Sequence, residues 1–345
     1  MKSTEPKVTV IIPNWNGIDH IFECLESLLK VEYPNLDVIV VDNNSEDGSP
    51  EAIAERFPDV QIIRNLRNLG FAEGCNVGIR RALKNGAAYV WLLNNDAFAD
   101  KQSLLSLVRT AEREDAIGMT GSKICYYDDP ALIWGVGMEI SWIRGEADAI
   151  GWHQRDTGQF ESCRDVDALV GCSLLIKRRV CEEVGLMDKD YFLYAEEVEW
   201  CVRARQCGFR CVVVPESIVF HKVGASSGES YRPIASYYNT RNMLRTIRKS
   251  FSFPRREIYL FTAIVFAIWK SRKHIVKACI VKCFGNRTYQ FDASALLGVM
   301  DFMLDRRGAK SRTAIMSFQN YKGLVPHQGV GSTRVDETME PPAQC

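Results

Sequence analysis

The sequence lacks several features that would assign it at once to a class of protein. Its 345 residues carry 43 Lys and Arg against 43 Asp and Glu, so no net charge favours nucleic acid as a partner. The first seven residues contain no apolar core of a secretory signal, and we therefore expect a cytoplasmic protein. No apolar run reaches the roughly 20 residues that a membrane-spanning helix needs.

Zinc-binding patterns are also missing, although twelve cysteines are present. The CxxxC pairs Cys207/Cys211 and Cys279/Cys283 lack the further Cys or His ligands of a structural zinc site. In a reducing compartment we expect free thiols that pack as small apolar side chains. With 25% charged and 46% apolar residues, the composition is that of an ordinary globular protein.

What is present is organised around residues 89–96, where five apolar residues lead into Asn94, Asn95 and Asp96. Such a short apolar run is typical of a strand buried on both faces of a parallel sheet. The polar residues would lie at its carboxyl end, where open α/β sheets bind ligands, and Asp96 suits a hard divalent cation. A capped turn is the alternative, because Asn and Asp are also common turn residues.

The same order of strand, polar loop and helix recurs through the first hundred residues. The apolar runs 8–12, 37–41 and 60–63 predict strands, and each is followed by a segment with helical spacing or capping. This alternation predicts βαβ units, hence an α/β fold with a mostly parallel sheet flanked by helices. The loops at Asn14, Asp42 and Asp96 should line one crevice.

The middle of the chain is less regular. Residues 117–167 predict short strands and long loops, in which tryptophans could stack on an acceptor sugar or pack in the core. An apolar strand is predicted over 166–178, with Gly171 inside it to allow close approach of a ligand.

A second group of acids, Glu196, Glu197 and Glu199, is predicted to occupy the first turn of a helix that ends near Gly208. Favourable interaction with the helix dipole would explain them without any catalytic role. Two strands, 211–215 and 218–220, follow, and His221 comes directly after the second. A single histidine in such a place is more often structural than a metal ligand.

Together these pieces resemble the inverting family-2 glycosyltransferases with the Rossmann-like GT-A fold, and look closest to their rhamnosyltransferase-like branch. The resemblance covers residues 7–245 and is carried by segments 11–17, 41–49, 68–78, 92–96 and 194–203, by His221 and by segment 238–242.

The resemblance implies a nucleotide-sugar site made of Pro13, Asn14, Asn16, Asp42, Asn44, Asn68, Gly70, Phe71, Asn76, Asn94 and Asn95. It implies a Mg²⁺ or Mn²⁺ ion on Asp96 and His221, and a catalytic base at Glu197, with Glu196 as the alternative. Two departures from the family pattern matter. Asn94 replaces the first carboxylate of the usual Asp-x-Asp, and Glu197 stands where Asp is commoner.

The C-terminal third contains a twelve-residue apolar run, 258–269, flanked by basic residues. Between Arg241 and Arg287 there are twelve Lys and Arg against one acid, Glu257. This pattern favours a helix lying on an anionic membrane surface, and a buried helix packed on the catalytic domain is the alternative. We expect three parts: a catalytic domain over 7–245, a helical membrane-associating extension over 246–312 and a poorly ordered tail over 313–345.

The sequence therefore predicts a metal-dependent inverting glycosyltransferase. It would use a nucleotide-diphosphate sugar, with rhamnose as one candidate sugar, and a glycan or polyprenyl-linked acceptor in surface polysaccharide synthesis. Peripheral contact with the inner face of the cell membrane is expected, and nucleic acid is not. A non-catalytic sugar-nucleotide-binding scaffold subunit is one alternative. The other is a nucleotidyltransferase of similar fold, although no Gly-rich phosphate loop bearing Lys or Arg lies near Asn14.

Overall fold

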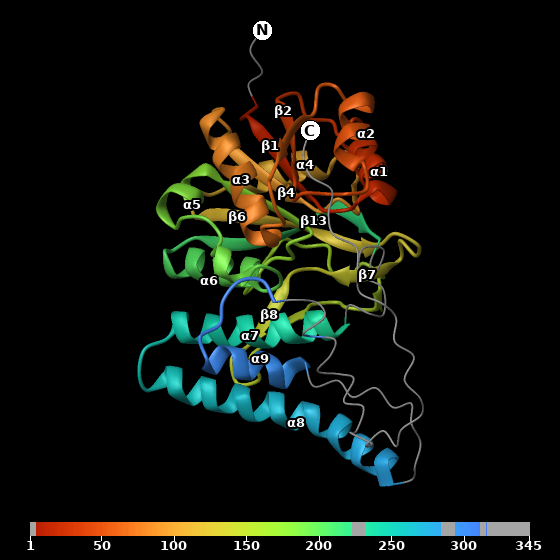
Figure 1. The fold of residues 1–345 in the computed structure, drawn as a ribbon. Helices are drawn as coiled ribbons and strands as arrows, with labels where there is room; N and C mark the ends of the chain where they lie inside the picture. Colours follow the sequence, from red (N-terminus) through yellow and green to blue (C-terminus); the bar gives the residue numbers. More distant parts are fainter. Residues whose placement is uncertain (1–4, 223–231, 284–293, 311–314, 316–345) are drawn as a thin grey trace, which may run out of the picture.

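Helices lie on both sides of one large mixed β-sheet, and three further helices form a layer beyond it (Figure 1). The computed structural model describes residues 5–222, 232–283, 294–310 and 315. The sheet and its small neighbour contain β1 Val8–Asn14, β2 Leu36–Asp42, β3 Gln61–Arg64, β4 Tyr89–Leu93, β5 Ala97–Ala99, β6 Ile117–Tyr126, β7 Leu132–Gly135, β8 Met138–Ser141, β9 Glu146–Ala149, β10 Gln154–Arg155, β11 Arg164–Asp165, β12 Ser173–Lys177 and β13 Arg210–His221. The helices are α1 Ile18–Leu28, α2 Ser49–Arg56, α3 Gly70–Lys84, α4 Ser103–Glu112, α5 Arg178–Glu183, the 3₁₀ helix η1 Lys189–Tyr191, α6 Glu196–Gln206, α7 Arg232–Ser250, α8 Arg255–Cys283 and α9 Ser294–Met303.

The N-terminal half of the sheet is parallel, with β4, β1, β2 and β3 as neighbours in that order. All five residues of β4 are buried, as its continuous apolar run predicts. The register of β1 on β2 sets Asn14 opposite Asp42, so the two polar loops start at the same edge. The alternation of strand and helix in the sequence therefore predicted this part of the fold correctly.

Two strands in the other half differ from the prediction. The apolar run 166–178 is not one strand: Gly171 and Cys172 form a turn, and β12 begins at Ser173 and runs antiparallel to β4. Hydrophobicity alone did not reveal this turn, because its residues are apolar and buried as well. The predicted strands 211–215 and 218–220 are a single strand, β13, whose pairing with β6 shifts between Val214 and Ile218.

Helices α7, α8 and α9 form the outer layer, with α8 farthest from the sheet (Figure 1). A small apolar core joins them, including Leu244 and Ile247 of α7, Ala263 of α8 and Phe302 of α9. Helix α8 has 29 residues, so it extends well beyond the apolar run 258–269 that predicted it. Helix α7 continues through residue 246, where the extension was expected to begin. Among the described helices, none combines the length and apolar character needed to cross a bilayer. The predicted tail over 313–345 lies outside the described residues apart from residue 315.

Candidate active site

The loops after β1, β2 and β4 meet at one edge of the sheet, as expected, and Asn14 is the residue that joins them. Its Oδ1 accepts a hydrogen bond from Asn95 Nδ2 at 2.9 Å. Its Nδ2 donates to Ser49 Oγ at 2.9 Å and more weakly to Asp42 Oδ1 at 3.4 Å. Asn14 and Asp42 are buried, so these two side chains hold the three loops together from within the protein.

The loop after β1 and the loop after β2 contact each other through Asn16. Asn16, at φ 50°, accepts a hydrogen bond on Oδ1 from Glu46 N at 2.8 Å. Asn44, at φ 63°, is exposed, so its side chain is available to a ligand. Left-handed backbone is uncommon outside glycine but most accessible to Asn, which suits both residues to these turns.

The segment 68–76 forms the start of α3 on the same side. Asn68 Oδ1 accepts from Gly70 N at 2.8 Å, and Gly70 has φ 80°. A side chain at Gly70 would lie 2.3 Å from the carbonyl oxygen of Phe192, while Phe71 N donates to that same oxygen at 2.7 Å. Asn76 is buried and exchanges two hydrogen bonds with the backbone of Met187, at 2.8 and 3.2 Å. This segment therefore connects the predicted nucleotide pocket to the chain that precedes α6.

Asp96 and His221 come together although 125 positions separate them. β13 pairs with β5 so that His221 lies opposite Ala97, and His221 Nε2 lies 3.0 Å from Asp96 Oδ1. Both side chains are largely buried, with 8% and 13% of the side-chain surface exposed for Asp96 and His221. The Trp134 ring packs edge-on against the imidazole, with ring centroids 5.9 Å apart.

Asp96 and His221 could hold a divalent cation only together with ligands from elsewhere, such as water or substrate oxygens. The pair supplies a carboxylate oxygen and an imidazole nitrogen, and the described residues contain no group of three or more Asp, Glu, His or Cys that could hold a metal alone. Mg²⁺ and related ions commonly take one or two carboxylates and fill their other positions with water and phosphate oxygens. Asn94 and Asn95, which directly precede Asp96 at the end of β4, are both partly exposed.

Glu196 and Glu197 begin α6, as predicted. Glu196 is 3% exposed, whereas Glu197 is partly exposed, and the Oε2 atom of each is buried without a hydrogen-bond partner among the described residues. Burial raises the pKa of Glu197 to about 7. Burial, followed by repulsion from Glu197, raises the pKa of Glu196 well above its usual value.

The turn before β12 places these glutamates close to the end of β4. Gly171 lies against Glu197, because a Cβ added there would be 3.4 Å from Glu197 Cγ. The next carbonyl oxygen, that of Cys172, accepts from Asn94 N at 3.1 Å. Gly171 was predicted to allow close approach of a ligand, and in the structure it borders the candidate base.

The whole-chain comparisons agree with this geometry. A model of the family described as Glycosyl transferase family 2 matches residues 9–185, which is just over half of the chain. The chain belongs to glycosyl transferase family 2. The predicted family and its class of activity, glycosyl transfer, are therefore confirmed.

Two relatives of this family 2 chain are rhamnosyltransferases by name. An N-acetylglucosaminyl-diphospho-decaprenol L-rhamnosyltransferase of Mycobacterium tuberculosis is 30% identical over 239 residues, which span 64% of this chain and 77% of that protein. A dTDP-rhamnosyl transferase of Shigella flexneri is 23% identical over 273 residues, spanning 74% and 87%.

Solved structures show the fold. A mannosyltransferase from Pyrobaculum calidifontis, in complex with GDP-Man and Mn²⁺, matches with a TM-score of 0.56 at 18% identity. The match covers 88% of this chain and 89% of that one. The predicted GT-A fold is confirmed.

Several residues of this family 2 site were not singled out by their sequence pattern. Asp47 accepts from Ile18 N at 2.8 Å and from Ser49 Oγ at 2.6 Å, which ties α1 to α2. Asn43 is buried and donates to the Gly70 carbonyl oxygen at 3.1 Å. Asn43 and Asp47 both lie in segment 41–49, so a closer reading of that polar run could have found them. The contact of Asn242 with the chain before α6 joins residues about 50 positions apart, and no local pattern signals it.

Proposed function

We propose that this glycosyltransferase transfers a sugar from a nucleotide-diphosphate donor to an acceptor hydroxyl with inversion at the anomeric carbon, and that Glu197 is the base. The observation that carries the proposal is a partly exposed glutamate that lies against Gly171, close to the end of β4, and whose pKa is raised to about 7. A carboxylate with this pKa accepts the hydroxyl proton far better than an ordinary glutamate, yet is still ionised in about half of the molecules at neutral pH. Direct attack on the sugar then needs only this one base.

Glu196 is the weaker candidate for the base. It is almost completely buried, and its pKa is raised by burial and by the neighbouring Glu197. A carboxyl with so little exposed surface is poorly placed to take a proton from a hydroxyl that approaches from solvent. We assign Glu196 to the support of Glu197, since its raised pKa favours the neutral form, which spares Glu197 the repulsion of a second charge.

The leaving group is a nucleoside diphosphate, which carries negative charge as the bond to the sugar breaks. Asp96 and His221 would hold a Mg²⁺ or Mn²⁺ ion against it. When bound, that ion supplies electrostatic stabilisation of the charge on the diphosphate. Asn14, Asp42 and Asn95 keep the loops around the donor in place through the hydrogen bonds described above. The names of two relatives support L-rhamnose as the sugar, and one of those names supports a polyprenyl-diphosphate-linked acceptor.

Contact with an anionic membrane surface is part of this proposal, because a lipid-linked acceptor is presented there. Helix α8 carries a row of exposed apolar side chains, with Phe261 69% and Ile268 48% exposed. The exposed cations Arg255, Lys270 and Arg272 lie on the same helix. This combination suits a helix that lies in the headgroup region.

Substitution of the two key carboxylates tests the proposed chemistry. In Asp96→Ala and Glu197→Ala, transfer from a panel of nucleotide sugars should fall by at least about 100-fold, as expected when an electrostatic ligand or a general base is removed. Glu55→Gln, an exposed glutamate on α2, is the matched control and should retain full activity. Thermal unfolding of each variant reports whether the fold is intact.

The same variants distinguish the alternatives. Full activity of both folded alanine variants would refute the mechanism. Isothermal titration of nucleotide sugars with and without Mn²⁺ would identify a scaffold subunit, which would bind without metal dependence and show no turnover.

A further inference from the structure

The chain directly before the two glutamates has an unusual backbone. Leu193 N donates to the Tyr191 carbonyl oxygen at 2.9 Å, closing a γ-turn whose central residue, Phe192, has φ 67° and ψ −58°. This form of γ-turn is rare and strained. Tyr194 at φ 65° and Ala195 at φ 63° follow it, and none of the three left-handed residues is a glycine. Such a backbone persists only where its surroundings enforce it, and it is most frequent at functional sites.

Asn242 of α7 contacts this segment at three successive points. Its Nδ2 lies within hydrogen-bond distance of the carbonyl oxygens of Tyr191 (3.0 Å), Leu193 (2.9 Å) and Tyr194 (2.6 Å), which share its two N–H donors. Asn242 has no exposed surface, so water does not compete for these bonds. One amide group thus holds carbonyl oxygens on both sides of the strained γ-turn.

Arg241 fixes the direction in which the Asn242 amide points. Arg241 Nε donates to Asn242 Oδ1 at 2.9 Å, which leaves the Asn242 NH₂ group facing the segment. Arg241 Nη2 donates at 2.9 Å to the Tyr191 carbonyl oxygen that Asn242 also contacts. Arg241 is itself fully buried, and its Nη1 donates to the Gly308 carbonyl oxygen at 2.7 Å.

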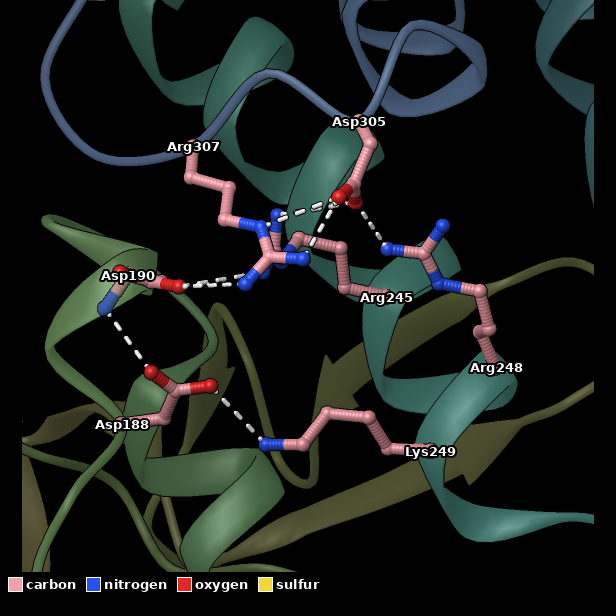
Figure 2. A pocket seen from close by; sticks show the side chains of 7 residues that line it. All are labelled: Asp188, Asp190, Arg245, Arg248, Lys249, Asp305 and Arg307. Atoms are coloured by element: carbon pink, nitrogen blue, oxygen red, sulfur yellow. Dashed lines mark hydrogen bonds and ion pairs between the residues drawn. The ribbon is translucent and has the colours of Figure 1, made fainter.

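Further residues on the same face of α7 contact segment 188–191 and helix α6. Thr246 Oγ1 lies 2.9 Å from the Tyr191 hydroxyl, and Lys249 Nζ donates to Glu199 at 2.6 Å and to Asp188 at 3.0 Å. Residues 242, 246 and 249 are spaced four and three apart and therefore lie on one side of the helix. Figure 2 shows Lys249 reaching from α7 to Asp188 on the facing loop.

We propose that Asn242, oriented by Arg241, is a positioning residue that holds segment 191–195 in the strained form that presents Glu196 and Glu197 to the reacting groups. The inference rests on the proposed function, since it assumes that this pair carries the base. Helix α3 also contacts the segment, through the bond from Phe71 N to the Phe192 carbonyl oxygen. The outer helical layer thereby forms part of the active site and does not serve only to attach the enzyme.

Asn242→Ala tests the proposal, because it removes the NH₂ group from three carbonyl oxygens. With the segment free to relax, Glu197 moves from its working position, and displacements of about 1 Å can cost roughly 100-fold in rate. We expect kcat to fall by about 10- to 100-fold in the full-length enzyme. The KM for the donor should rise by a smaller factor than the one by which kcat falls, since Asn242 reaches the donor pocket only indirectly, through the bond from Phe71 N to the Phe192 carbonyl oxygen.

The control is Asn239→Ala, which removes the same group from an exposed position on α7 and should leave kcat unchanged. A second test is the double variant N242A/A195G. Glycine adopts positive φ without the steric cost that alanine incurs, so kcat should recover in part if the role of Asn242 is to hold the left-handed backbone. A folded N242A enzyme with kcat within twofold of the wild type would overturn the proposal.

Asn242→Ser retains one donor and replaces N242A in the test if N242A does not fold. A folded N242S enzyme with kcat within twofold of the wild type would then overturn the proposal. Loss of the unfolding transition in both variants would assign Asn242 to folding and would also overturn the proposal. Glu197→Gln is measured alongside to separate the two hypotheses. If it stays active, the proposed base is wrong; if it is inactive while N242A is fully active, only the positioning role is wrong.

Discussion

At the scale of single residues, Glu196 and Glu197 differ in exposure although they are adjacent in the sequence. Both follow the left-handed Ala195 into the first turn of α6, yet only Glu197 reaches the partly exposed side. Burial raises the pKa of both carboxyls, and repulsion from Glu197 adds to the rise at the more deeply buried Glu196. Their surroundings thus give two identical side chains different exposure, and only the partly exposed Glu197 is accessible to an acceptor hydroxyl.

The pKa of Glu197 predicts how transfer depends on pH. Since the base must be ionised, kcat should rise with pH and reach half its plateau near pH 7. Initial rates between pH 5 and 9, at saturating donor and metal, measure this rise of kcat with pH. A half-maximum between pH 4 and 5, the range of an ordinary glutamate, would contradict the assignment.

The same shift predicts a cost in stability. The folded state binds this proton with a pKa of about 7 and the unfolded state with about 4.5, so the free energy of unfolding falls as pH rises through that interval. Glu197→Gln removes the charge and should raise the free energy of unfolding at pH 8 by about 1–3 kcal/mol. Denaturant titrations at pH 4.5 and 8 measure the difference. Glu55→Gln, at an exposed site, should show no comparable effect.

At the scale of elements, the strands were predictable because their burial is continuous. β1, β2 and β4 are buried apolar runs that end in polar residues, and their parallel pairing brings Asn14, Asp42 and Asn95 into one hydrogen-bonded group. The local sequence is enough to predict this arrangement. Each strand is recognisable from its own apolar run, and the carboxyl ends of parallel strands lie at the same edge of the sheet. The proximity of Asp96 and His221 was predicted from the family resemblance and not from any local sequence pattern.

Other features were beyond local pattern. The turn at Gly171 and the shift within β13 lie inside apolar stretches, so hydrophobicity does not reveal them. The left-handed backbone at Phe192, Tyr194 and Ala195 opposes the intrinsic preference of those residues and exists through contacts with α7. Tertiary contacts, which a single sequence does not display, determine these parts of the site.

The crossing of α7 and α9 supplies an element-scale prediction. Gly298 of α9 packs so closely on α7 that an added Cβ would lie 2.7 Å from the Tyr237 carbonyl oxygen and 3.2 Å from Arg241 N. Backbone atoms cannot move aside as side chains can. Gly298→Ala should therefore lower the free energy of unfolding by about 1–3 kcal/mol. In an open helix the same change would stabilise by up to about 1 kcal/mol.

Thermal unfolding measures this effect. A lower melting temperature for Gly298→Ala would support the close packing of α9 on α7. Met300→Ala, at a half-exposed position on the same helix, is the control and should change stability by less than about 0.5 kcal/mol. A melting temperature for Gly298→Ala that equals or exceeds that of the wild type would show that α9 does not press on α7 in this way.

At the scale of the whole molecule, positive and negative charges balance but are unevenly distributed along the chain. The chain as a whole is neutral, but the stretch from Arg241 to Arg287 holds twelve cations and one acid. Much of that stretch forms α8, at the outer side of the molecule (Figure 1). Ile258, Phe261, Val265 and Ile268 are all exposed there at helical spacing, so they form one apolar row.

This outer face predicts binding to anionic lipid. Burying Phe261 and Ile268 in the headgroup region contributes about 1.5–3 kcal/mol for each side chain that is fully buried, and each nearby Lys or Arg adds about 1 kcal/mol on an anionic surface. The double variant F261E/I268E should reduce partition onto vesicles of phosphatidylglycerol and phosphatidylcholine by at least about 100-fold, measured by co-sedimentation. Leu29→Glu, an exposed leucine that follows α1, is the control for adding a carboxylate and should bind as the wild type does.

Raising the salt to 0.5 M should weaken wild-type binding, because screening removes the electrostatic part while the apolar contact remains. Equal binding to purely zwitterionic vesicles would deny the cations any role, and unchanged binding of the double variant would mean that α8 does not face the membrane.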